Sequence, residues 1–213
     1  MSKQLWPAEG VFLACVDDDV IVLNLAADRY DGLLDAGDRI RLDDNGALHI
    51  VDADIAAELI AGRIATAAQP LSRNPRPVAA RRELQSDPAP AGRDVLRAAI
   101  SLLTATLRFR GRSLLSLVTF RHRLSDPDAV SEARLGELVG AARVARPWIP
   151  FEGECLQRSF LLRAHLAAQG VATDWIFGVA TWPFAAHCWL QIGDLVVGDR
   201  LSRVSRFTPI MRV

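Results

Sequence analysis

The chain has 213 residues, half of them apolar, which is enough to bury a sizeable core in one large domain or two small ones. Lys and Arg together number 25, as do Asp and Glu, so the net charge gives no support to a nucleic-acid or anionic-membrane partner. Cys15, Cys155 and Cys188 are odd in number and widely scattered, which argues against a disulfide framework. The N-terminus lacks a signal-peptide core, and arginines interrupt the most apolar later run, 98–118. We therefore expect a cytoplasmic protein without a membrane span.

The first sixty residues predict short strands followed by a helix. The runs "VFLACV" and "VIVLNL" are apolar and β-branched and are separated by three aspartates, which is the composition of a hairpin. A third candidate strand is "DRYDGLL". In "DADIAAELIAGRIATAA" apolar residues recur at helical spacing after a capping Asp52 or Asp54. The pattern predicts a small α+β unit over residues 1–68.

The rest of the chain reads as helices first and then a sheet. Five of the eleven prolines fall between residues 69 and 92, which we interpret as a linker. Beyond it, "DVLRAAISLLTATLRFR" has apolar residues at helical spacing, and "RSLLSLVTFRHRL" continues the pattern after a break near Gly111. The segment 154–170, "ECLQRSFLLRAHLAAQG", predicts a helix that ends at Gly170. Strand-like sequence follows it.

Cys155 is the second residue of that segment. The unpaired N–H groups and the dipole of a helix N-terminus favour an anion, so this position favours a thiolate. A thiol of pKa about 8.5 is only a few per cent ionised at neutral pH, whereas one lowered to roughly 6 is mostly ionised. A nucleophilic thiolate also needs an imidazole to protonate the leaving group and an acceptor to orient that ring. His187 and Asp199 are the residues that we expect to fill these two roles.

Strand parity separates His187 from its neighbour Cys188. His187, Trp189 and Gln191 share one face of the predicted strand, and Cys188 lies on the other. We therefore expect Cys188 in the core, turned away from the site. Zinc bound by Cys155, His187 and Cys188 is disfavoured, because adjacent strand residues point apart and the chain has no C-x-x-C or H-x-x-x-H spacing.

For His187 to lie opposite Asp199, the predicted hairpin needs one extra residue. A two-residue Gly193–Asp194 turn would place Cys188, not His187, opposite Asp199. We therefore predict either a three-residue loop centred on Gly193 or a bulge at Gly198. Asp194 is the competing aspartate, but it lies at the tip of the turn.

The order of a Cys at a helix start, a His at the head of a strand and an Asp on the next strand resembles the transglutaminase-like cysteine hydrolase fold. More narrowly, "CLQRSFLLRAHLAAQG", "PFAAHCWLQIGD" and "VVGD" resemble the leader peptidases of lasso peptide biosynthesis, the B proteins. The resemblance is close over residues 150–200. One departure is Cys188, where alanine is usual in the family; an extra thiol near the site raises its sensitivity to oxidation.

The N-terminal segment is similar to the PqqD-like winged-helix module that recognises leader peptides. Such modules bind a leader as an added strand at a sheet edge. The resemblance implies that "VIVLNLAADRYDGLL" forms the second and third strands, with Tyr30 and Leu33 at the binding edge. The alternative is a stabilising subdomain that binds no ligand.

The resemblance implies an α+β chain with three parts. A small winged-helix-like (PqqD-like) recognition domain occupies residues 1–68, and the proline-rich linker spans 69–92. Residues 93–213 form a transglutaminase-like, papain-like cysteine protease domain with helices packed on an antiparallel sheet. The catalytic residues would be Cys155, His187 and Asp199.

The implied activity is removal of the leader from a lasso precursor peptide, which frees the core N-terminus for a partner. That partner is an ATP-dependent, asparagine-synthetase-like cyclase. No nucleotide motif is present, so we expect no directly bound cofactor; any ATP requirement would act through the partner or an unrecognised site. Two alternatives stay open, a transglutaminase-like acyltransferase and a non-catalytic peptide-binding scaffold.

Overall fold

The computed structural model describes residues 3–69, 77–86, 89–119, 130–150 and 153–213. Contacts divide the chain into two compact units, and the C-terminal part of the chain contributes to both. The first unit comprises Met1–Pro77, Phe177–Ala186 and Arg206–Arg212. The second unit comprises Val78–Ile176, His187–Ser205 and Val213. The contiguous boundaries at 68 and 92 stay a prediction from sequence.

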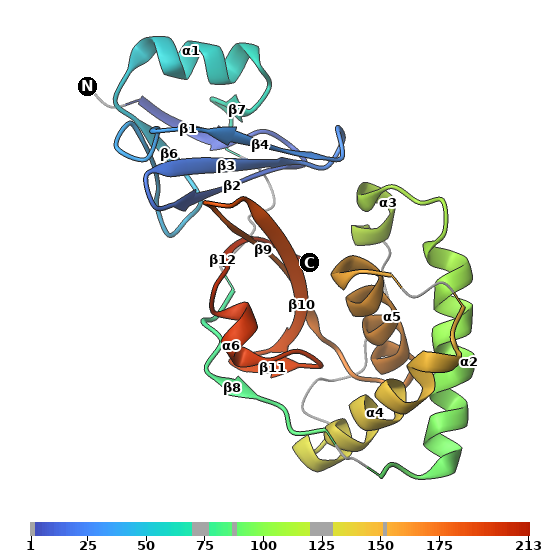
Figure 1. The fold of residues 1–213 in the computed structure, drawn as a ribbon. Coiled ribbons are helices and arrows are strands. Elements are labelled where there is room, and N and C mark those ends of the chain that lie inside the picture. Colours follow the sequence, from blue (N-terminus) through green and yellow to red (C-terminus); the bar gives the residue numbers. More distant parts are fainter. Residues whose placement is uncertain (1–2, 70–76, 87–88, 120–129, 151–152) are drawn as a thin grey trace. The chain divides into compact units, whose positions relative to one another are not determined.

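The N-terminal part of the first unit contains two antiparallel sheets and helix α1 (Figure 1). One sheet has the order β5-β6-β1-β7 and the other the order β2-β3-β4. The elements are β1 (Lys3–Pro7), β2 (Val11–Val16), β3 (Asp19–Asn24), β4 (Arg29–Leu33), β5 (Ile40–Leu42), β6 (Leu48–Ile50), α1 (Ala53–Ala61) and β7 (Ala65–Thr66). Helix α1 packs against β1, β6 and β7 of the first sheet.

The predicted hairpin is confirmed as β2 and β3. Its register pairs Val16 with Asp19 across a two-residue turn, in which Asp17 has a positive φ of 52°. The third predicted strand is β4, which pairs antiparallel with β3. Of the two candidate caps for the helix, Asp52 is the N-cap, and its side chain accepts a hydrogen bond from the backbone N–H of Asp54.

The core of the first unit is a cluster of buried aliphatic side chains from both sheets and α1. Strand alternation and the apolar face of α1 supply them, as the sequence pattern predicts. They are Leu5, Val11, Leu13, Val20, Val22, Ala36, Ile40, Leu48, Ile50, Ala56, Leu59 and Ala65. The unit therefore has a hydrophobic core of its own.

The second unit holds the longer helices. They are α2 (Gly92–Phe109), α3 (Leu114–Val118), α4 (Glu132–Ala145) and α5 (Cys155–Ala168), followed late in the chain by α6 (Leu201–Val204). Helix α2 packs on both α4 and α5 (Figure 1). The Phe160 ring on α5 lies between Phe109 at the end of α2 and the fully buried Trp175, with ring centroids 5.6 and 5.9 Å away. No helix in the described part of the chain is long and apolar enough to cross a membrane.

A five-stranded sheet has the order β12-β9-β10-β11-β8. Its strands are β8 (Arg82–Glu83), β9 (Asp174–Ala180), β10 (Ala185–Ile192), β11 (Leu195–Val197) and β12 (Thr208–Arg212). Strand β8 pairs parallel with β11, although it belongs to the proline-rich stretch that we interpreted as a linker. The backbone N–H groups of Arg81 and Arg82 donate to the carbonyl of Asp194, which anchors this stretch to the hairpin. Strand β8 could not be predicted from sequence, because a strand of two residues carries almost no periodic signal.

Candidate active site

Cys155 is the first residue of helix α5, one position earlier in its helix than expected. Its N-cap is Glu154, whose side chain makes no capping hydrogen bond. No side chain therefore caps the first-turn N–H groups, and the positive end of the helix dipole lies next to the Cys155 thiol. This position favours the thiolate. The Cys155 side chain is half-buried and lines a cavity of about 970 Å³. The Cys155 thiol is thus both favoured as a thiolate and accessible from the cavity.

His187 and Asp199 meet beside that helix start. The His187 Nε2 atom lies 2.6 Å from Asp199 Oδ2. The other carboxylate oxygen, Oδ1, accepts a hydrogen bond of 2.7 Å from the backbone N–H of Arg200. Since Asp199 occupies Nε2, Nδ1 is the ring nitrogen available to the thiol of Cys155, with which His187 is hydrogen-bonded. All three side chains line the same cavity.

The chain reaches Asp199 by an irregularity at Gly198. The β10–β11 ladder pairs Ile192 with Leu195 and Leu190 with Val197 across a two-residue turn, so the predicted three-residue loop is wrong. The ladder ends at Val197, and Gly198 follows with φ +76°. The positive φ favours glycine, and a Cβ at Gly198 would lie 2.3 Å from Leu162 Cδ2, so the end of that side chain would have to move. The departure from regular pairing therefore occurs at Gly198, the second of the two positions predicted from sequence.

Hydrogen bonds set the ionisation of the site. The pKa of Cys155 is lowered from 9.0 to about 4, first by a hydrogen bond with the Cys188 thiol and then by one with His187, against an opposing effect of burial. Burial acts to lower the pKa of His187, but hydrogen bonds to Asp199 and Cys155 outweigh it and raise this pKa to about 9. Burial also opposes ionisation of Asp199, yet the His187 ring holds the pKa of that carboxyl below its usual value. Between the pKa of Cys155, about 4, and that of His187, about 9, the stable form is a Cys155 thiolate paired with a His187 imidazolium.

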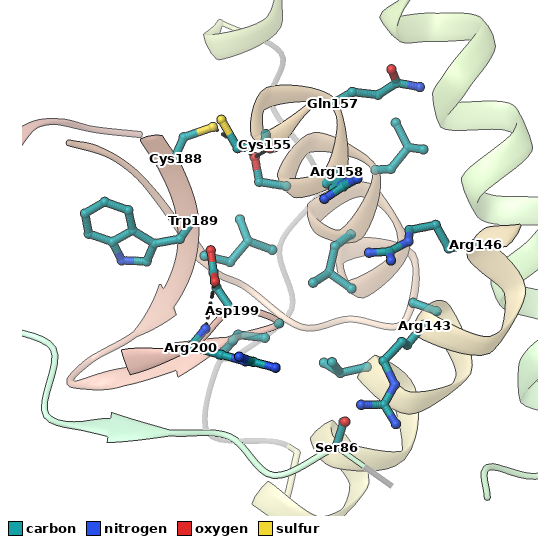
Figure 2. A pocket seen from close by; sticks show the side chains of 18 of the residues that line it. Ser86, Arg143, Arg146, Cys155, Gln157, Arg158, Cys188, Trp189, Asp199 and Arg200 are labelled. Carbon is teal, nitrogen blue, oxygen red and sulfur yellow. Dashed lines mark hydrogen bonds between the residues drawn. The ribbon is translucent and has the colours of Figure 1, made fainter. Parts of the chain in front are cut away.

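Cys188 lies against Cys155, contrary to the expectation that it points away from the site. Its side chain is buried, as expected, but its thiol is hydrogen-bonded to Cys155, and Figure 2 shows the two sulfur atoms next to each other. Strand parity places Cys188 away from the site only where the opposite strand face packs away from it. Helix α5 covers that face instead, since Ser159 Oγ on its second turn lies 3.3 Å from Cys188 Sγ. The contact and burial raise the pKa of the Cys188 thiol.

Ser159 holds the start of helix α5 in place. Its hydroxyl donates to the carbonyl of Cys155 at 2.7 Å and accepts from the indole Nε1–H of Trp175 at 2.8 Å. Trp175 is fully buried, so this bond satisfies a donor that has no access to water. This role could not be predicted from sequence, because a serine within a helix carries no signal of its hydrogen-bond partner.

Several arginines line the cavity. Figure 2 shows Arg143, Arg146, Arg158 and Arg200 around the hollow, and Arg203 also lines it. These residues come from α4, the 3₁₀ turn η2 (Arg146–Trp148), α5, and α6 with its N-cap, so only the fold brings them together. No group of three or more His, Cys, Asp or Glu side chains within the described ranges is arranged to hold a metal ion.

The two residues expected at a leader-binding edge lie on β4 in the first unit. Strand β4 has β3 as its single neighbour among the described strands of its sheet. Leu33 is partly buried against the core of that unit. The Tyr30 ring lies 5.6 Å from that of Phe184, measured between centroids. Because three positions separate them along the strand, Tyr30 and Leu33 belong to opposite faces.

Comparison with known proteins places this geometry in context. Residues 99–212, just over half of the chain, match the profile of the Transglutaminase-like superfamily. A stretch of 63 residues is 27% identical to the Microcin J25-processing protein McjB of Escherichia coli. That stretch spans 30% of this chain and 30% of the Escherichia coli protein. No solved structure matches the chain.

Proposed function

Because the chain belongs to the transglutaminase-like superfamily, we propose that it is a cysteine peptidase that removes the leader from a lasso precursor peptide. The observation that carries the proposal is the half-buried Cys155 thiol at a helix start, next to a His187–Asp199 pair. The partial similarity to McjB, whose name describes microcin J25 processing, supports a role in lasso peptide processing.

The proposed chemistry is acyl transfer through a thioester. The Cys155 thiolate attacks the scissile carbonyl, and the C–N bond breaks as the His187 imidazolium gives its proton to the departing amine. His187 then takes a proton from water, which attacks the thioester and releases the leader carboxylate and the Cys155 thiolate. Asp199 orients the ring and stabilises its charged form. The backbone N–H of Cys155 is the candidate donor to the oxyanion.

Residues 1–68 are the proposed leader-recognition part. A leader could add a strand along the edge of β4, where backbone groups supply affinity and side chains such as Tyr30 and Leu33 supply selectivity. Since Leu33 packs inward, its contribution would come from shaping the edge, whereas Tyr30 and Phe184 form an aromatic surface. A PqqD-like character for this part belongs to the same proposal.

The released core amine defines the next partner. An ATP-dependent cyclase of the asparagine-synthetase type would join that amine to a side-chain carboxylate, and we expect a complex with it. Any dependence of cleavage on ATP would then act through the cyclase. A cytoplasmic location fits a pathway with a free thiol nucleophile.

The superfamily match equally suits an acyltransferase that passes the thioester to an amine instead of water. Incubating the protein with a lasso precursor peptide, followed by mass spectrometry, separates the two: hydrolysis adds water across one bond, and transfer adds the amine. Cys155→Ala should abolish both reactions, and Cys15→Ala, which changes a thiol of the first unit, should abolish neither. Processing that survives Cys155→Ala would overturn the proposal.

A further inference from the structure

Cys155 and Cys188 are the two thiols of the second unit, and they lie against each other. Cys155 is the first residue of α5, and Cys188 lies on β10. The Cys188 thiol is hydrogen-bonded to that of Cys155, and Figure 2 shows the two sulfur atoms side by side. Both are free thiols, as is Cys15, which belongs to the first unit. The fold therefore brings together two reduced sulfur atoms from distant parts of the chain.

A single hydroxyl group ties both cysteines to the same point of the fold. Ser159 Oγ, one turn along α5, donates to the carbonyl of Cys155 at 2.7 Å and lies 3.3 Å from Cys188 Sγ. It also accepts a 2.8 Å hydrogen bond from the indole N–H of Trp175 on β9, the strand beside β10. The start of α5 is thus held against two neighbouring strands. We expect a disulfide of about 2.05 Å to need only rotation of the two side chains.

The two thiols differ in exposure and in ionisation. Cys155 is half-buried at the cavity, whereas Cys188 is only 4% exposed. Hydrogen bonds with Cys188 and then His187 lower the pKa of Cys155 to about 4. Contact with Cys155 and burial raise the pKa of Cys188. Because peroxides oxidise thiolates rather than thiols, a small oxidant that enters the cavity should react at Cys155 first.

We propose that hydroperoxides convert Cys155 and Cys188 into a disulfide, which blocks the candidate active site reversibly. A cysteine sulfenic acid condenses with a neighbouring thiol, and without one it is oxidised to forms that thiol reductants do not restore. Cys188 is the thiol that captures the oxidised Cys155. The crosslink itself needs no catalysis, and only the loss of precursor cleavage rests on the peptidase function proposed above.

The steps balance with hydrogen peroxide as the oxidant. The Cys155 thiolate attacks one peroxide oxygen, the O–O bond breaks, and the leaving hydroxide takes the proton of the His187 imidazolium to form water. The Cys188 sulfur then attacks the sulfenic sulfur, the S–O bond breaks, and the released hydroxide leaves as water with the Cys188 proton. The two sulfur atoms lose two electrons, which the peroxide gains. A dithiol reductant restores both thiols by exchange.

The first step prepares the second. The hydrogen bond with Cys155 is the main cause that raises the pKa of Cys188, followed by burial and by the charge of the Cys155 thiolate. A sulfenic acid carries no such charge at neutral pH, so its formation removes the contribution of the thiolate. His187 has by then lost its proton and is a base beside the reacting sulfur atoms. Both changes favour attack by Cys188.

Tryptic mapping tests for the crosslink, because trypsin releases the three cysteines in separate peptides, 4–29, 144–158 and 164–200. After hydrogen peroxide, the wild type should give 144–158 linked to 164–200, and the intact mass of the monomer should fall by two hydrogen atoms. Cys15→Ala is the matched control and should give the same crosslink. Dithiothreitol should then restore the alkylation of Cys155 by iodoacetamide. Loss of Cys155 alkylation without this crosslink, or a crosslink between two molecules, would overturn the inference.

Cys188→Ala and Cys188→Ser test the capturing role. Neither variant can form the crosslink, so dimedone should trap a sulfenic acid at Cys155. Further peroxide should yield sulfinic and sulfonic acids that dithiothreitol does not reverse. Iodoacetamide labelling of Cys155 before oxidation shows whether each variant keeps the site. In Cys155→Ala, the buried Cys188 should stay reduced at the same dose. Recovery of the Cys188 variants equal to that of the wild type would contradict the capturing role.

Cleavage assays separate a failure of this inference from a failure of the proposed function. Peroxide should abolish cleavage of a lasso precursor by the wild type, and dithiothreitol should restore it. If the crosslink forms but the reduced protein cleaves no precursor, the peptidase function fails and the disulfide stands. If the reduced protein cleaves the precursor but no crosslink forms, the disulfide fails alone.

Discussion

His187 Nε2 and Asp199 Oδ2 lie 2.6 Å apart, with only 11% and 14% of their side chains exposed. A charge-assisted hydrogen bond in so little water is strong and directional. It fixes the ring with its other nitrogen directed to the thiol, and it stabilises the imidazolium. Asp199 is therefore expected to act through His187 rather than on substrate.

Asp199→Asn tests that role. The amide keeps the shape but removes the charge, so precursor cleavage should slow roughly 100-fold or more. The pKa of His187, which Asp199 raises, should fall, and the high-pH limb of the rate profile should move to lower pH. Asp194→Asn, on the turn of the same hairpin, is the matched control and should leave the profile unchanged. A profile that does not move would contradict a positioning role for Asp199.

The thiolate–imidazolium pair predicts a wide pH plateau for the reactivity of Cys155. The pKa of Cys155 is lowered to about 4 and that of His187 is raised to about 9, so the pair persists between these values. Alkylation by iodoacetamide should be nearly constant from about pH 5 to pH 8, whereas an ordinary thiol accelerates steeply over that range. Peptide mapping separates Cys155 from Cys15 and Cys188, with glutathione as the reference. A rate that follows glutathione would show that the pair does not form.

Gly198 should be intolerant of a side chain. Alanine at this position meets Leu162 at 2.3 Å and has to adopt φ near +76°, so Asp199 would shift from His187. We expect Gly198→Ala to lower cleavage roughly 10- to 100-fold, as small displacements of catalytic groups do. Gly193→Ala, with φ +57° and no atom within 4 Å of the added Cβ, carries the backbone strain without the clash. Equal activity of the two variants would count against a packing role for Gly198.

Local sequence patterns predicted the residues of the candidate site. The contacts that they did not predict depend on tertiary packing. A helix start, a strand and a glycine turn are short-range patterns, which is why Cys155, His187 and the irregularity at Gly198 could be anticipated. The contact of Cys188 with Cys155 depends on which sheet face α5 covers, and strand parity does not contain that information. The arginines that line the cavity come from separate helices, so their proximity could not be predicted from local patterns either.

The same limit applies to the fold. The β2–β3 hairpin lies within fourteen residues, so its presence could be predicted from composition, although its two-residue turn and register were not. Strand β8 pairs with β11 over a separation of more than a hundred residues, and nothing in a proline-rich stretch marks that partner. Residues 177–186 and 206–212 belong to the first unit, whereas their neighbours in sequence belong to the second. This assignment likewise depends on long-range packing.

The ion pair of the buried Asp94 with the partly exposed Arg134 should stabilise the packing of α2 on α4. The guanidinium binds the carboxylate through two hydrogen bonds of 2.7 and 3.1 Å, and the Asp94 side chain is 2% exposed. Asp94→Ala removes the buried acceptor of two charge-assisted hydrogen bonds, while the partly exposed Arg134 keeps Glu137, so urea denaturation should show a loss of about 1.5–3 kcal/mol in the free energy of unfolding.

Glu137→Ala provides the control, because Glu137 contacts the same guanidinium but is 45% exposed. Its loss should cost less than about 1 kcal/mol. The Arg134 hydrogen bond lowers the pKa of Asp94, so the difference between wild type and Asp94→Ala should be full above the unfolded pKa of about 3.9 and shrink as the pH falls below it. Similar losses for the two variants at neutral pH would show that burial does not distinguish the two carboxylates.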